Sequence, residues 1–189
     1  MWLDRVKQVY GDKLDVTWKH FSLEQANSKK GPDWRVWEQS DVATANSLLS
    51  QIALEAAKRQ GADAFDRYHL ALLTARHGGA GRIALNRLEP ILEVARGAGL
   101  DADRLREDMD DATLAERVGR DHIEAVGEHG VFGTPTFVFE GGGAAYLKTF
   151  IPPEDDSAAF FDLFVALASH RTYFGELKRP QPPWPRGAV

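Results

Sequence analysis

Apolar and polar residues recur with two different periods along the chain, and each period predicts its own kind of element. Between Trp2 and Tyr10 the apolar residues fall on one face of a helix, and Gly11 provides a stop. A period of two places Leu14, Val16, Trp18 and His20 on one side and Asp15, Thr17 and Lys19 on the other, which predicts a strand with one buried face that ends at Phe21. A surface loop follows over residues 22 to 41, and we expect its two tryptophans to anchor it.

A helical period fills residues 44 to 99, where three apolar stripes predict three helices. The stripes are Leu48, Ile52 and Ala56, then Phe65, Tyr68, Leu72 and Ala75, then Leu85, Leu88, Leu92 and Ala95. Short breaks that contain glycine separate them, as between antiparallel helices of a bundle. Pro90 must either kink the third helix or lie in its first turn. A short helix at Asp103 to Asp108 and a long one from Thr113 to Gly130 complete the block.

After Gly130 the pattern returns to strands. The apolar run PTFVF, residues 135–139, predicts a strand buried on both faces, and residues 145–150 predict a second strand. The residues EGGG between them can turn a hairpin. Asp155 and Asp156 open a last amphipathic helix, and a proline-rich extended tail follows. Strands mixed with helices predict an α/β fold.

Composition limits the partners and the chemistry. The 189 residues suit one domain, and the net charge of -5 is spread over mixed signs, so we expect no nucleic acid partner. No apolar run is long enough for a membrane span and the first residues lack a signal-peptide pattern, so we expect a cytoplasmic protein without membrane contact. The chain has no cysteine, which excludes disulfides, thiolate metal sites and a cysteine nucleophile.

Other groups of polar residues favour structural roles. His122 and His129 lie two helical turns apart, too far for one metal ion. The acidic residues between 107 and 111 lack the glycine and the final glutamate of a calcium loop. His20 lies at a strand end, where it either reaches a ligand or forms a structural hydrogen bond. We therefore predict no metal site.

Two segments resemble the DsbA-like branch of the thioredoxin-like fold. GVFGTPTFVF, residues 130–139, is similar to that family's cis-proline loop, and WKHFSLEQ, residues 18–25, is similar to its second strand and following loop. The resemblance spans nearly the whole chain. It implies an α/β thioredoxin-like fold with an inserted helical bundle. The implied parts are residues 1–43 and 112–175 for the thioredoxin-like part, 44–111 for the helical insertion, and 176–189 for the tail.

The resemblance also implies a binding surface. The Thr134–Pro135 peptide would be cis, and the loop would present main-chain atoms to a thiol-containing small molecule or an extended peptide. The substrate-binding residues that it implies are Phe132, Gly133, Thr134 and Pro135, with Phe21 and Ser22 beside them.

The sequence departs from the family at its start. In the family a first strand precedes the opening helix and ends in Cys-x-x-Cys, or in a Cys or Ser variant, at the helix N-terminus. Both are absent here, so we expect a catalytically incomplete protein with no catalytic residue of its own. We also expect either a fragment, a misplaced start codon, or a partner strand supplied by another copy in a homo-oligomer.

Three functions stay open. The first is a member of the thiol-disulfide oxidoreductase family without its catalytic segment and without a cofactor. The second resembles hydroxychromene-carboxylate isomerase and kappa-class glutathione transferases, which use a low-molecular-weight thiol such as glutathione or mycothiol. The third is a non-enzymatic peptide-binding or assembly module, whose cleft would be lined by Trp18, Phe21 and Phe132.

Overall fold

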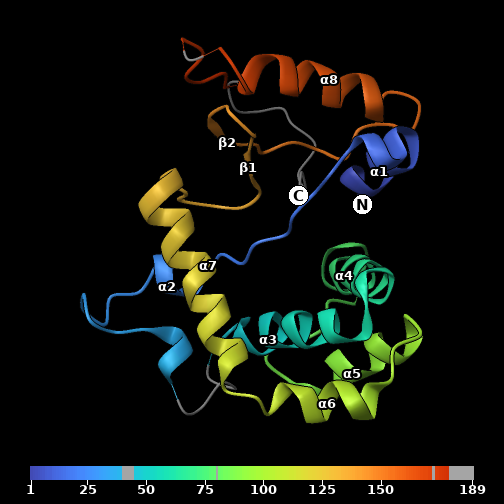
Figure 1. Cartoon of the computed structure of the whole chain (residues 1–189), viewed down its shortest axis with the longest axis vertical. Helices are drawn as coiled ribbons and strands as arrows, with labels where there is room; N and C mark the ends of the chain where they lie inside the picture. Colours follow the sequence, from blue (N-terminus) through green and yellow to red (C-terminus); the bar gives the residue numbers. More distant parts are fainter. Residues whose placement is uncertain (40–44, 80, 172, 179–189) are drawn as a thin grey trace. The chain divides into compact units, whose positions relative to one another are not determined.

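The computed structural model describes residues 1–39, 45–79, 81–171 and 173–178, and this part of the chain forms two compact units. The first unit comprises Met1–Thr17 and Ala125–Val189, and the second comprises Trp18–Glu124. The elements, coloured along the chain in Figure 1, are α1 (Trp2–Tyr10), η1 (Gly11–Lys13), α2 (Leu23–Ala26), η2 (Val36–Glu38), α3 (Leu48–Ala57), η4 (Lys58–Gln60), α4 (Ala62–His77), α5 (Leu88–Gly97), α6 (Ala102–Met109), α7 (Thr113–His129), β1 (Thr136–Val138), β2 (Ala144–Tyr146) and α8 (Ser157–Ala168). The boundaries predicted above for a thioredoxin-like part and a helical insertion remain a prediction.

The first unit has a small aromatic core between two helices. α1 and α8 lie against each other (Figure 1). Their buried apolar residues are Trp2, Val6, Phe161 and Phe164. The apolar stripe predicted from Trp2 to Tyr10 is confirmed as a helix, and Gly11 ends it with a positive φ of 53°. Because a side chain disfavours that conformation, glycine is the natural residue at this end.

A two-stranded antiparallel hairpin completes the first unit. β1 pairs with β2 so that Phe137 lies opposite Ala145, and Gly141 takes a positive φ of 64° in the turn between them. The predicted hairpin is confirmed, although its second strand ends at Tyr146 rather than at residue 150. The prediction that β1 is buried on both faces is wrong, since Val138 is 50% exposed. Phe137 packs on the aromatic core while Val138 points to the opposite face of the strand, as the strand period requires.

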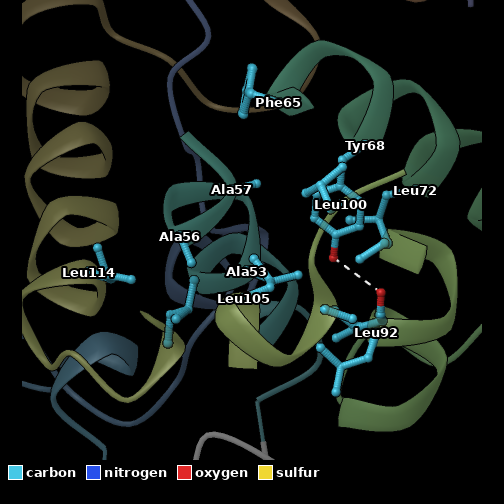
Figure 2. Packing of buried hydrophobic residues seen from close by; sticks show 14 of the residues in the cluster. Ala53, Ala56, Ala57, Phe65, Tyr68, Leu72, Leu92, Leu100, Leu105 and Leu114 are labelled. Atoms are coloured by element: carbon cyan, nitrogen blue, oxygen red, sulfur yellow. Dashed lines mark hydrogen bonds between the residues drawn. The ribbon is translucent and has the colours of Figure 1, made fainter. Parts of the chain in front are cut away.

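The second unit is helical and holds the larger core. Figure 2 shows its buried side chains, which come from α3, α4, α5, α6 and the start of α7. Tyr68 is fully buried, and its hydroxyl donates a hydrogen bond to the Ile91 carbonyl oxygen at 3.3 Å. The first two predicted stripes are confirmed as α3 and α4. The third helix begins at Leu88 rather than Leu85, and Pro90 lies in its first turn, where the lost N–H has no partner to lose.

The helix predicted from Thr113 is confirmed as α7, and it carries a close packing contact. Asp111 accepts the Thr113 main-chain N–H at 2.9 Å and so caps its first turn. Further along, Gly119 is buried against the ring of Trp37. Trp34 and Trp37 both pack on the core of this unit, as predicted for the loop that carries them.

The strand predicted for residues 14 to 21 is absent from the structure. Burial does alternate there, with Leu14, Val16, Trp18 and His20 less exposed than the residues between them, but no ladder forms. Side chains take the main-chain groups at its end instead. Asp121 accepts the His20 N–H at 2.9 Å, and the Gln51 amide donates to the Phe21 carbonyl at 3.2 Å. The alternating pattern predicted the buried side of the segment correctly. It did not predict a strand correctly, because a strand also needs a partner strand to bind its main chain.

Some predictions fall on residues outside the described part of the chain. These are the last two positions of the loop at residues 40–41, the start of the helical block at Thr44, and the tail from residue 179 onward.

Candidate functional site

The turn that joins α7 to β1 holds four of the six predicted binding residues. Gly130 leaves the helix with a positive φ of 62°, and the chain reaches β1 through Phe132, Gly133, Thr134 and Pro135. The Thr134–Pro135 peptide is cis. Two hydrogen bonds hold this turn: the Thr136 hydroxyl donates to the Gly133 carbonyl at 2.7 Å, and the Leu147 N–H donates to the Pro135 carbonyl at 3.1 Å.

The same turn places main-chain groups that no other described residue binds beside an aromatic pair. No described residue donates to or accepts from the main-chain N–H and C=O of Phe132 and Thr134. The Phe132 side chain is 73% exposed, and its ring lies 5.1 Å from the Tyr146 ring. A Cβ on Gly133 would lie 3.2 Å from the Tyr146 ring, so glycine lets that ring approach the main chain closely. The turn therefore offers polar main-chain atoms and an apolar surface together.

The first turn of α1 lies close to the strand that follows this turn. The Trp2 ring is 6.4 Å from the Phe137 ring, two residues beyond Pro135. The Trp2 indole N–H also donates to the Ser157 carbonyl at 2.9 Å, which fixes the ring at the start of α8. The start of α1 is thus part of the same aromatic core as β1.

The other two predicted residues, Phe21 and Ser22, lie in the second unit around a buried histidine. The Phe21 ring is 4.7 Å from the His122 ring, and His122 Nδ1 accepts the Ser22 main-chain N–H at 3.2 Å. Ser22 is 1% exposed and its hydroxyl accepts the Gln25 N–H at 3.1 Å, which makes it the N-cap of α2. Burial lowers the pKa of His122, with a smaller contribution from the positive charge of Arg35. Ser22 and His122 therefore bind each other and the neighbouring main chain, and these contacts hold the start of α2 in place.

A third group in the second unit was missed from the sequence. His20 lies in the segment of residues 14–21, Glu55 on α3 and Asp121 on α7, and the three side chains meet. The His20 Nε2 atom lies 2.9 Å from Glu55 Oε1. Lys58 also pairs with Glu55, and Lys19 with Asp121 at 3.4 Å. Burial alone would raise the pKa of Glu55, but hydrogen bonds from His20 and Lys58 outweigh it and lower that pKa to about 2. Glu55 therefore stays charged although its side chain is only 4% exposed.

Comparison with known proteins decides the family. The model of the DSBA-like thioredoxin domain matches residues 1–162 of the 189. The chain belongs to the DSBA-like thioredoxin family. Its fold is the DSBA-like thioredoxin fold, so the family predicted from the two resembling segments is confirmed. A search of the curated proteins finds no match.

This DSBA-like chain lacks the reactive group of thiol-disulfide exchange. It contains no cysteine, so none of its own residues can form the thiolate that attacks a disulfide. Within the described residues no helix has both the length and the apolar character needed to cross a membrane.

The predicted binding residues of this DSBA-like domain form two groups. Residues 132–135 lie together in one turn of the first unit, and Phe21 and Ser22 lie together in the second. A single binding surface made from both groups remains a prediction.

Proposed function

We propose that this member of the DSBA-like thioredoxin family binds a thiol compound or an extended peptide at residues 132–135 without catalysing thiol-disulfide exchange itself. The observation that carries the proposal is that the main-chain groups of Phe132 and Thr134 have no hydrogen-bond partner among the described residues. An extended segment could pair with these donors and acceptors as an added strand pairs with an exposed edge. The absence of cysteine supports a binding role.

The aromatic pair beside the turn supports the same proposal. Phe132 and Tyr146 place an exposed apolar surface next to the free main-chain groups. Main-chain hydrogen bonds supply affinity that depends little on sequence, and an adjacent aromatic surface supplies preference for particular side chains. An extended peptide or a flexible thiol compound of peptide type fits both features.

Calorimetry on the full chain tests the proposal. The probes are a short extended peptide with one cysteine, the same peptide with serine in its place, and reduced glutathione. We expect saturable binding of the cysteine peptide, weakened about ten-fold by Phe132→Ala because an exposed aromatic anchor is lost. The matched control is Leu163→Ala, which removes a side chain of α8 that is 64% exposed and should leave affinity unchanged.

The three probes separate the functions left open by the sequence. A preference for cysteine over serine supports recognition of a thiol-bearing peptide. Binding of glutathione but of neither peptide favours a thiol-cofactor isomerase or transferase, and equal binding of both peptides favours a peptide-binding module. No binding of any probe, or equal affinity in wild type and Phe132→Ala, would contradict the proposed site. Reduction of insulin by the purified chain would contradict the proposed lack of thiol chemistry.

A further inference from the structure

Three side chains with metal-ligand atoms meet inside the second unit. His20 Nε2, a Glu55 carboxylate oxygen and an Asp121 carboxylate oxygen all lie within 4.8 Å of one another. Their side chains are only 11%, 4% and 17% exposed. The sequence separates His20 from Asp121 by 101 positions, so the fold of this unit brings them together.

We propose that His20, Glu55 and Asp121 form a binding site for a Zn²⁺ ion. One imidazole nitrogen and two carboxylate oxygens are a donor set that zinc takes in proteins, with bonds of about 2.0–2.2 Å. Two such ligands on a tetrahedral ion lie roughly 3.4 Å apart. The 2.9 Å between His20 Nε2 and Glu55 Oε1 therefore has to open only slightly to admit the ion. Three protein ligands leave the fourth position to water.

The ligands are held in place before an ion arrives. Asp121 Oδ2 accepts the main-chain N–H of His20 at 2.9 Å, which fixes one carboxylate beside the imidazole and leaves Oδ1 for a cation. Glu55 lies on the buried face of α3 among core residues. A carboxylate in that position is costly unless a cation or a donor compensates it, so the site selects for positive charge.

Two lysines supply that positive charge in the structure, and the ammonium group of each can move away from its carboxylate into water. Lys58 pairs with Glu55, and Lys19 pairs with Asp121 at 3.4 Å. Their side chains are 38% and 49% exposed, so each ammonium group can turn into water without being buried elsewhere. Lys19 also keeps a second partner, Glu124, at 3.1 Å. Zinc would thus exchange with mobile cations rather than enter an uncharged site.

Zinc titration of the metal-free full chain by calorimetry tests the site, with Mg²⁺ as the comparison ion. We expect one zinc ion to bind per chain and Mg²⁺ to bind far more weakly, because a nitrogen ligand suits zinc. His20→Ala, Glu55→Gln and Asp121→Asn should each weaken zinc binding by about ten-fold or more. The matched control is His129→Ala, a histidine of α7 outside the cluster, which should bind zinc as the wild type does.

Lys58→Met distinguishes a zinc site from a plain ion-pair cluster. The substitution removes the ammonium group that competes for Glu55, so it should tighten zinc binding. Zinc should also raise the thermal unfolding midpoint of the wild type and not of Glu55→Gln, because a ligand that binds only the folded state stabilises it. The proposal is overturned if the wild type binds no zinc, if the cluster variants bind it as the wild type does, or if Lys58→Met weakens binding.

Discussion

Gly119 of α7 lies so close to the Trp37 ring that a single methyl group should cancel or reverse the usual stabilising effect of a glycine-to-alanine change in a helix. A Cβ built on Gly119 would lie 2.6 Å from the indole of Trp37, well inside contact distance. Gly127 is in the same helix, and a Cβ there meets nothing within 4 Å. The pair is therefore a matched test of one packing contact.

The two substitutions should change the free energy of unfolding by amounts that differ in sign or in size. Alanine is favoured over glycine in a helix interior by about 1 kcal/mol, which both variants gain. Forcing a methyl group into a filled space costs about 1–3 kcal/mol, which only Gly119→Ala incurs. We expect Gly127→Ala to be more stable than the wild type by up to about 1 kcal/mol. Gly119→Ala should be less stable than Gly127→Ala by about 1–3 kcal/mol.

Urea unfolding followed by far-ultraviolet circular dichroism measures both free energies of unfolding. A third variant, Trp37→Ala combined with Gly119→Ala, removes the ring that the methyl group strikes. In the Trp37→Ala background the change at Gly119 should therefore be neutral or stabilising. Equal stability of Gly119→Ala and Gly127→Ala would refute the close approach of Trp37 to α7.

Three further predictions follow from other contacts. Glu55 has its pKa lowered from 4.5 to about 2 in the folded state, so its stabilising contribution is present above pH 4.5 and is lost as the pH falls toward 2. In urea unfolding, Glu55→Gln should therefore make the free energy of unfolding depend less on pH over this range. An unchanged dependence on pH would count against the ion pairs of Glu55. Tyr68→Phe removes the hydroxyl that donates to the Ile91 carbonyl and should cost about 1 kcal/mol in the same assay. Tyr173→Phe, at a position 85% exposed, should cost nothing, and equal effects of the two substitutions would contradict this prediction. Among the described residues β1 pairs only with β2, so we expect self-association through its free edge in light scattering, and a monodisperse monomer at every concentration would argue against it.

The helices were largely predictable because their signal is local. The repeats Leu48, Ile52, Ala56 and Phe65, Tyr68, Leu72 each place a stripe on one face of a helix, and the structure buries those stripes. The hairpin was predictable for the same reason, since EGGG supplies a turn between two apolar runs. The family was predictable from residues 130–139 and 18–25, whose likeness depends on sequence and not on contacts.

The predictions that failed concern contacts between residues that lie far apart in the sequence. Alternation along residues 14 to 21 indicates a buried face, but whether a strand forms is decided by a second strand, and side chains of α3 and α7 bind that main chain instead. The sequence did not predict the His20–Glu55–Asp121 cluster for a similar reason, because its members lie far apart along the chain. Glu55 reads as one charged residue in an apolar helix, and 35 positions separate it from His20. A charged residue on an otherwise buried stripe was the one available signal.

The amide resonances of Phe132 and Thr134 test the central claim most directly. In a two-dimensional ¹⁵N–¹H spectrum of the full chain, titration with the cysteine peptide should shift these two amides, because their N–H groups have no partner among the described residues and would gain one. The amide of Leu163 should stay in place. Binding that shifts other amides and leaves Phe132 and Thr134 unmoved would contradict the claim that this turn binds the ligand.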